Sequence, residues 1–300
     1  MKSKNWLIYI IIVTIMVAII ASIIMIVRSS LNGNIQKLSN KIDDELEYLD
    51  KTTLAMINQL NNLKTTDEIQ IKRTSVGETS QNIMSNSNQE ESTSSSSKST
   101  EDSKSNNENQ NIEKYYIEYN SVLLRDTNTV DWNDLENQAE NLYDSWVTIT
   151  LDLNTMNVSS DDILSYNTNL DNLMISIKDK NKVNSAICLA NLYSLVPKYM
   201  SETSEDQPKI QIGYIKSDIL SAYSLLDTEK WNDITNLLGS AESKLTEFMN
   251  GGYNLSSMRQ AKVNKAYVLL KELIKSSNEK NKDLFYLKYI SLIQELEDIG

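Results

Sequence analysis

The spacing of hydrophobic and polar residues changes several times along the chain. Residues 6–27 form an uncharged apolar run, WLIYIIIVTIMVAIIASIIMIV. Apolar residues then recur in steps of three and four over residues 35–63, and this spacing returns over residues 132–296. Steps of three and four are typical of amphipathic helices. The pattern therefore predicts an all-α protein with an N-terminal transmembrane helix, an amphipathic stalk helix, a disordered tether and a distal helical domain.

The apolar run is long enough to cross a membrane. Its 22 residues would extend about 33 Å as a helix, and a bilayer's hydrocarbon core is about 30 Å thick. A cleaved signal peptide usually has a shorter apolar region that ends in small residues, whereas Ala18 and Ala21 lie inside this run. We therefore expect a transmembrane helix at 6–27, preceded by a short tail at 1–5.

Charges around the run suggest its orientation. Lys2 and Lys4 precede it and Arg28 follows it. The positive-inside rule favours a cytoplasmic N-terminus, although Arg28 argues the other way. The prediction is a single-pass cell-membrane protein with most of the chain extracytoplasmic.

A single apolar stripe predicts an amphipathic stalk helix at 33–64. Its members are Ile35, Leu38, Ile42, Leu46, Leu49, Thr53, Met56, Leu60 and Leu63. Such a stripe needs a partner, either a second copy in a coiled coil or the distal domain folded back. The heptad d positions Glu45, Thr52 and Gln59 make a poor dimer seam. The acids Asp43, Asp44, Glu45 and Glu47 predict a solvated helix face.

Residues 78–112 are dominated by Ser, Asn, Gln, Glu and Lys and contain no aromatic residue. Such a composition buries too little apolar surface to offset chain entropy. It predicts a disordered linker that acts as a flexible tether.

The distal domain, residues 113–300, carries the pattern of seven helices, with a short leading segment that contains Tyr115, Tyr116 and Tyr119. Capping residues place several helix ends. Asp131 and Ser159 predict helix starts, with Asp161 and Asp162 as first-turn acids favoured by the helix dipole. The remaining predicted boundaries are a helix end near Pro197, helix starts at Pro208 and Thr228, and a helix end at Gly251-Gly252.

A weak internal repeat divides this domain. Trp132-Asn133-Asp134-Leu135 resembles Trp231-Asn232-Asp233-Ile234 at an offset of 99, and Asp179-Lys180-Asn181-Lys182 resembles Glu279-Lys280-Asn281-Lys282 at an offset of 100. The repeat predicts two three-helix units, 131–199 and 228–299, joined by a helix at 208–226. Both a TPR-like array and an ordinary bundle fit the pattern.

Composition excludes several chemistries. The net charge of −12 disfavours nucleic acid as a partner. The chain has no histidine and one cysteine, Cys188, so Ser-His triads, histidine-containing zinc sites and internal disulfides are ruled out. We find no phosphate-binding loop, dinucleotide-binding glycines, CxxC or GxSxG motif. The prediction is a protein that is not an enzyme, with no cofactor or metal site and with Cys188 as a buried thiol.

Aromatic residues are the remaining candidates for a site. Trp132, Trp146 and Trp231 lie on apolar stripes and are expected in the core. Four tyrosines could rim a partner-binding groove between helices, with packing at the edge of the core as the alternative: Tyr193, Tyr199, Tyr214 and Tyr223.

The layout resembles uncharacterised membrane-anchored helical proteins of low-GC Gram-positive bacteria. The likeness lies in the apolar run, the Ser/Asn-rich linker and the distal stretch IEKYY…DWNDLENQAENLYDSWVTITLDL…SSDDILSYN…LANLYSLVPKYM. This resemblance implies a location and a fold and transfers no functional residue.

The sequence leads to one main hypothesis and two alternatives. The main hypothesis is a membrane-anchored, non-enzymatic module that binds a protein or peptide partner or acts as a scaffold. One alternative is an envelope sensor subunit that forms a homodimer through residues 35–63. The other is an enzyme with a pair of catalytic acids, although no sequence feature selects such a pair.

Overall fold

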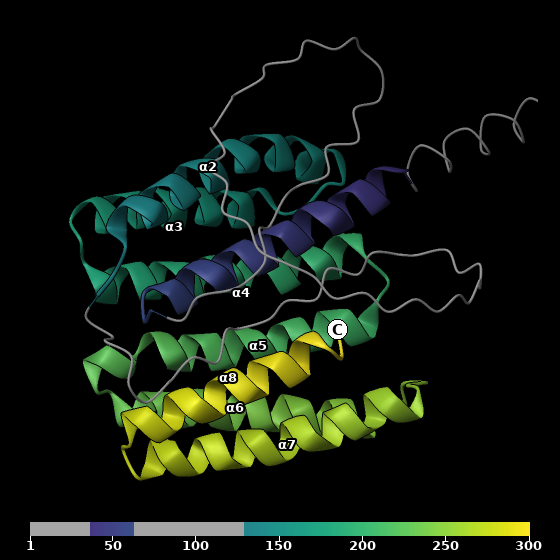
Figure 1. The fold of residues 1–300 in the computed structure, drawn as a ribbon. Coiled ribbons are helices and arrows are strands. Elements are labelled where there is room, and N and C mark those ends of the chain that lie inside the picture. The colour runs from purple at the N-terminus through teal and green to yellow at the C-terminus, as the bar shows by residue number, and fades with distance from the viewer. Residues whose placement is uncertain (1–36, 63–128) are drawn as a thin grey trace, which may run out of the picture. The chain divides into compact units, whose positions relative to one another are not determined.

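A computed structural model describes residues 37–62 and 129–300, and both ranges belong to one compact unit. Every regular element in these residues is a helix, so this part of the chain is an all-α bundle. The first helix covers 37–59. The others are α2 (Trp132–Thr155), α3 (Ser160–Lys178), α4 (Lys182–Thr203), α5 (Gln207–Ser224), η1 (Leu226–Thr228), α6 (Trp231–Asn250), α7 (Ser257–Asn278) and α8 (Lys282–Glu297) (Figure 1).

Several predicted segments lie outside the described residues. They are the tail at 1–5, the transmembrane helix at 6–27, the linker at 78–112 and the tyrosine-containing segment that precedes α2. Within the described residues, none of the helices is long and apolar enough to cross a membrane.

The predicted stalk helix is part of the bundle. Ile42, Leu46, Leu49, Met56 and Leu60 are fully buried in the same core as the distal helices. Side-chain contacts tie the helix to α2, α4, α5 and α8. The apolar stripe was expected to pack either on a second copy or on the distal domain. In the structure it packs on the chain's own distal helices. The stalk prediction is therefore corrected, because 37–59 does not stand apart from the domain.

The two described ranges meet at one end of the bundle. Gln59 Nε2 donates to Asp134 Oδ2 at 2.6 Å, and Gln138 Nε2 donates to Gln59 Oε1 at 2.7 Å. The last turn of the first helix therefore lies beside the first turns of α2. Residues 63–128 connect two neighbouring helices of one bundle, and they do not link a stalk to a separate domain.

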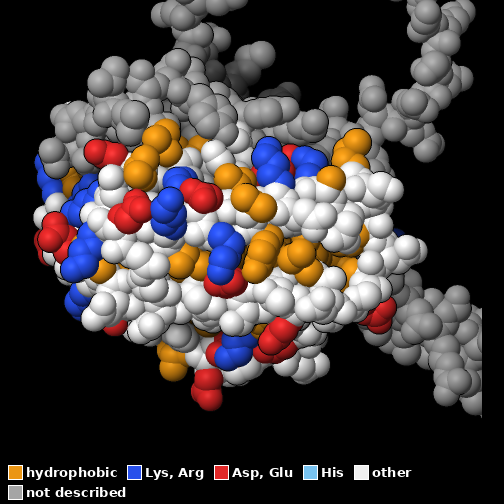
Figure 2. Space-filling view, turned by 90° about the horizontal axis from the view of Figure 1, so that it is seen from below, with side chains coloured by type: hydrophobic (Ala, Val, Ile, Leu, Met, Phe, Trp, Pro, Cys, Tyr) orange, Lys and Arg blue, Asp and Glu red, His pale blue; other side chains and the backbone are white. Residues whose placement is uncertain are grey.

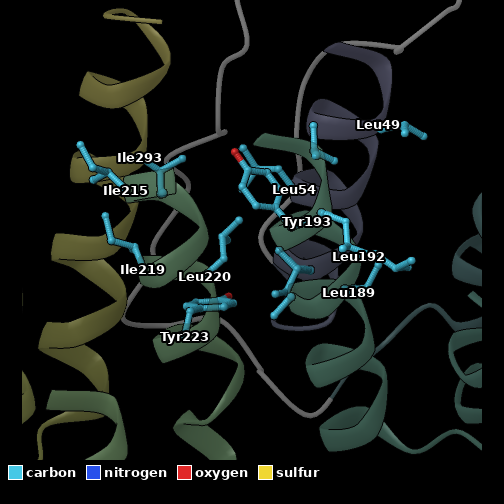
Figure 3. Close-up of a cluster of buried hydrophobic side chains, with 14 of the residues drawn as sticks. Leu49, Leu54, Leu189, Leu192, Tyr193, Ile215, Ile219, Leu220, Tyr223 and Ile293 are labelled. Carbon is cyan, nitrogen blue, oxygen red and sulfur yellow. The ribbon is translucent and has the colours of Figure 1, made fainter. Parts of the chain in front are cut away.

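The eight main helices fall into two four-helix groups (Figure 1). Helix 37–59, α2, α3 and α4 form the first group, and α5 to α8 form the second. Consecutive helices pack side by side from α2 to α8, and α5 also contacts α8. The groups join where helix 37–59 and α4 meet α5 and α8. Figure 3 shows core side chains at this junction: Leu49 and Leu54 of helix 37–59, Leu189, Leu192 and Tyr193 of α4, Ile215, Ile219, Leu220 and Tyr223 of α5, and Ile293 of α8.

The turn from α3 to α4 is repeated between α7 and α8. Lys180 and Lys280 both have φ of 53°, in the left-handed region. Asn181 and Asn281 then cap the next helix by accepting a backbone N–H three residues on, at 3.1 and 3.0 Å. The described residues thus show the same local backbone at the offset of 100 seen in the sequence.

Most predicted helix ends agree with the structure, and two are wrong. Asp131 caps α2, and Gly251 follows the last residue of α6. Pro197 lies inside α4, which continues to Thr203, and a Cβ atom on Gly213 would come within 2.9 Å of the proline ring. Glycine at 213 therefore lets α5 approach α4 closely. Thr228 ends a short 3₁₀ turn, and α6 begins at Trp231.

Candidate partner-binding surface

The four predicted groove tyrosines do not line an open groove. Tyr193 and Tyr199 are fully buried, Tyr223 is 2% exposed, and Tyr214 is partly buried against the core. The prediction of a tyrosine-rimmed binding groove is therefore wrong. Helices α4 and α5 pack directly against each other, and helix 37–59 contacts both of them, so these tyrosines pack in or against the core.

A buried ionic cluster holds the two groups together. Lys216 of α5 contacts Asp50 Oδ2 at 2.9 Å and Glu297 Oε1 of α8 at 2.5 Å, and Tyr193 of α4 donates to Asp50. Burial alone would lower the pKa of Lys216, but the two carboxylates raise it well above its usual value. Burial raises the pKa of Glu297, despite the stabilising Lys216 charge. Helix 37–59, α4, α5 and α8 each contribute one residue.

A second polar layer joins the same helices. Asn61 Nδ2 donates to Tyr223 Oη at 2.9 Å, while Tyr286 donates to Asn61 Oδ1 and Tyr289 to Asn58 Oδ1, both at 2.8 Å. All five side chains are buried. Asn58 lies in helix 37–59 and Asn61 in the turn that follows it, so these bonds fix the C-terminal end of that helix against α5 and α8.

The interior of the first group also holds polar atoms without a partner. Within the described residues, the hydroxyls of Thr52 and Thr150 are buried and make no hydrogen bond. The buried hydroxyls of Thr53 and Tyr166 interact with each other without a well-formed hydrogen bond, and one buried carboxylate oxygen of Glu45 has no donor. Burial and the nearby Asp152 carboxylate raise the pKa of Glu45 to about 7, although Lys41 opposes this shift. Glu45 was expected on a solvated face, and this expectation is wrong.

Tryptophans and neighbouring tyrosines stack inside the first group. Trp146 lies parallel to Tyr166, with ring centroids 3.9 Å apart, and its centroid is 6.0 Å from that of Tyr199. Trp132 and Trp231 are partly buried against the core. The prediction of core tryptophans is therefore confirmed for Trp146 and met only in part for Trp132 and Trp231.

An asparagine-lined hollow lies between α3 and α4, with a volume of about 320 Å³. Its lining residues include Asn169, Asn172, Asn181, Asn184 and Asn191. Cys188 also lines the hollow and is half-buried, and burial raises the pKa of its thiol. The prediction of a buried thiol is thus only partly met.

Three of these asparagines are replaced in the second group. At the offset of 100, Asn169 and Asn184 become Leu269 and Leu284, and Asn172 becomes Glu272, which contacts Lys288 at 2.5 Å. The asparagine-rich lining is therefore specific to the first group.

The outer face of α2 and α3 combines exposed apolar side chains with acids. Among the described residues, five of the seven exposed large hydrophobic side chains lie here: Tyr143, Val147, Leu151, Leu164 and Ile175. These two helices hold eight acids and a single basic residue, Lys178. The exposed acids on the same face are Glu136, Glu140, Asp144 and Asp171, and none of them forms a salt bridge within the described residues. We call these nine residues the α2/α3 face.

The matching helices of the second group have a different charge balance. Together, α6 and α7 hold six basic residues and four acids. Lys262, Lys265 and Lys271 of α7 pair with Asp298, Glu295 and Glu242. Figure 2 views the molecule from the side on which α7 lies in Figure 1, and basic and acidic side chains sit next to one another there. Three of the four lysines of α7 are therefore neutralised by acids of the same chain.

Sequence reasoning missed the α2/α3 face, although one signal was present. Helix α2 contains no Lys or Arg, and Tyr143, Val147 and Leu151 repeat at four-residue steps beside the core stripe. Comparison of the chain with protein-family models, curated proteins and solved structures gives no match. The surface itself therefore has to carry the functional argument.

Proposed function

We propose that the protein is a single-pass membrane-anchored, non-enzymatic module that binds a protein or peptide partner outside the cytoplasm. The anchor is the apolar run at 6–27, and Lys2 and Lys4 favour a cytoplasmic N-terminus. Helix 37–59 belongs to the bundle, so only residues 28–36 separate the run from the folded domain. The domain would then be held close to the membrane surface.

The α2/α3 face is the observation that carries this proposal. Exposed apolar side chains gathered on one surface are typical of protein interaction sites. None of the four exposed acids forms a salt bridge within the described residues, whereas three of the four lysines of α7 are paired with acids of the chain. The first group thus presents a surface that a partner would complete.

The buried ionisable groups support a binding role over catalysis. Asp50, Lys216 and Glu297 contact one another across helices and serve to hold the bundle together. The alternative of a dimerising sensor is less well supported, because it needs the 35–63 stripe to face a second copy. Ile42, Leu49 and Met56 of that stripe are buried within one chain.

We also propose that the two four-helix groups stack as in a helical-repeat array of the TPR-like kind. The shared turn at Lys180 and Lys280, with the same asparagine cap after each, supports this arrangement. Each group would be one unit of the array, and α2 and α3 would form one of its outer layers.

A photo-cross-linking pair tests the binding role. Val147 on α2 is 56% exposed and Val268 on α7 is 60% exposed, so the two positions are matched in residue type and accessibility. Each is replaced in turn by benzoylphenylalanine in the full chain, and intact cells are irradiated. We expect a discrete adduct from position 147 and none of the same mass from 268. Equal labelling from both positions, or no adduct at 147, would count against the proposal.

A thiol-labelling experiment tests the location. The variant Cys188→Ala with Ser96→Cys carries one thiol, placed in the Ser/Asn-rich stretch, and intact cells receive a membrane-impermeant maleimide. Labelling without lysis is expected. Labelling only after lysis would place the domain in the cytoplasm and contradict the proposed localisation.

A further inference from the structure

The α2/α3 face has the geometry of a helix-binding strip. Glu136, Glu140, Val147 and Leu151 of α2 are spaced so that they lie on one side of the helix. From the first to the last is about 22 Å at 1.5 Å per residue, which is about four helical turns. On α3, Leu164, Asp171 and Ile175 follow the same spacing.

The two helix faces adjoin. Glu136 of α2 and Ile175 and Lys178 of α3 line one hollow, together with Met174 and Ile177, with a volume of about 290 Å³. Because α2 and α3 are consecutive packed helices, their outward sides form one continuous surface. An amphipathic helix that lies along such a strip places its apolar residues at i, i+3, i+4 and i+7.

Charge decides what kind of helix would fit. The exposed acids Glu136, Glu140, Asp144 and Asp171 flank the apolar residues and have no salt-bridge partner in the described part of the chain. An acidic helix would be repelled, while Lys or Arg beside its apolar stripe would meet these carboxylates. A second copy that used its α7 would offer four lysines, of which three are already paired within its own chain.

We infer that the α2/α3 face binds a cationic amphipathic helix of a protein partner. The partner's apolar stripe lies on Tyr143, Val147, Leu151, Leu164 and Ile175, and its basic residues lie against the four exposed acids. This inference rests on the proposed binding function and specifies the chemistry of the ligand.

A designed peptide provides the probe. It is a helix of about 18 residues, with leucine at i, i+3, i+4 and i+7 and lysine elsewhere, and a comparison peptide has glutamate in place of lysine. Binding to the full chain in nanodiscs of zwitterionic lipid is followed by fluorescence anisotropy. Nanodiscs with wild-type or variant protein have the same lipid composition. Partitioning of the peptide into lipid therefore contributes equally to both binding curves.

Two α2 variants and two matched controls locate the contact. The first variant combines Val147→Ser with Leu151→Ser, and the second combines Glu136→Gln, Glu140→Gln and Asp144→Asn. We expect each variant to bind the lysine peptide about tenfold or more weakly than wild type. Rising salt should also weaken binding. One control variant combines Met258→Ser with Val268→Ser on α7. The other combines Glu205→Gln, Glu247→Gln and Glu279→Gln, which lie elsewhere on the surface. Each control should change binding of the lysine peptide by less than about twofold. All substituted side chains are exposed, and circular dichroism verifies that the variants fold.

Four results would overturn the inference. The first is no binding of the lysine peptide at about 100 μM, and the second is tighter binding of the glutamate peptide than of the lysine peptide. The third is a loss of binding in the control variants equal to that in the α2 variants. The fourth is a wild-type dimer that an α2 variant converts to a monomer, measured by light scattering. The last would assign the face to a second copy. A partner adduct at position 147 without binding of the lysine peptide would leave the proposed function standing and reject only the cationic-helix chemistry. If neither is seen, both proposals fail.

Discussion

The two four-helix groups share a backbone plan but differ inside and outside. In both groups a lysine with a left-handed backbone conformation is followed by an asparagine that caps the next helix. All the buried polar side-chain atoms that lack a partner within the described residues belong to the first group. The four exposed acids of the α2/α3 face, which form no salt bridge within the described residues, belong there too, whereas three of the four lysines of α7 are paired.

This difference suggests a division of labour. The second group has a satisfied interior and three of the four lysines of α7 paired with acids of the chain, so it can serve as a stable support. The first group contains the helix nearest the predicted membrane anchor and also presents the α2/α3 face. Polar groups that lower stability are tolerated at sites selected for function. The following predictions test this contrast, from the largest expected effect to the smallest.

Removing the central cation of the junction should have the largest effect. Lys216→Met leaves Asp50 and Glu297 buried without their counter-charge, which should lower the free energy of unfolding by about 3–5 kcal/mol. Chemical denaturation followed by circular dichroism measures this change. The control is Lys244→Met, because Lys244 makes a more exposed salt bridge with Asp218 and should cost about 1 kcal/mol or less. Equal losses in the two variants would show that the junction cluster is not important for stability.

Two cavity-creating substitutions at equivalent positions test whether the two groups are structurally equivalent. Leu170 and Leu270 are both fully buried and stand 100 positions apart. Replacing either by alanine should cost about 2–5 kcal/mol, and the two costs should agree within about 1 kcal/mol. Denaturant unfolding of both variants measures the pair. A gap of more than about 2 kcal/mol would contradict the shared plan.

Removing an unpartnered hydroxyl should stabilise the first group. Thr52→Val keeps the side-chain shape and removes a buried oxygen that has no partner among the described residues, so we expect a gain of about 1–2 kcal/mol. Thr246→Val in α6 is the control, since that exposed hydroxyl bonds to the Glu242 carbonyl at 2.8 Å. The control should change stability by less than about 0.5 kcal/mol. A destabilised Thr52→Val protein would mean that the hydroxyl is satisfied in solution.

Glu45 should make stability fall as pH rises. Its pKa is about 7 in the folded chain, above the ordinary value of 4.5, so the folded state holds a proton that the unfolded state has lost between these values. Stability from this group is therefore full below about pH 4.5 and is lost as pH rises to about 7. We compare the free energy of unfolding of Glu45→Gln with that of wild type at each pH. The difference in favour of the variant should be about 1 kcal/mol larger at pH 8 than at pH 4.5. Thermal melts across this range measure the difference, and parallel pH profiles would refute the assignment.

The sequence predicted the helices well because their apolar stripes recur locally. The spacing of Leu135, Ala139 and Leu142 indicates α2 without any knowledge of its neighbours, and all three are buried. Asp131 and Gly251 mark helix ends through short-range hydrogen bonding and backbone freedom. These features depend on residues within a few positions of each other.

The placement of helix 37–59 could not be predicted in the same way. Asp50 pairs with Lys216, 166 positions away, and no local pattern reveals that contact. Glu45 and Thr52 made the helix look unsuited to an apolar interface, yet both are buried. The same limit explains the misplaced tyrosine groove, because a tyrosine on an apolar stripe suits a groove rim and a core equally well until the neighbouring helix is known.

Hydrogen exchange of helix 37–59 in the full chain tests the central claim most directly. Leu49, Leu54 and Met56 lie in the core that α4, α5 and α8 share, so the amides around them should exchange as slowly as those of α5. Mass spectrometry of peptides covering 42–58 and 210–222, from the chain in nanodiscs, gives the comparison. Similar protection in both peptides is the predicted result. Fast exchange over 42–58 with α5 still protected would show a detached stalk and contradict the account.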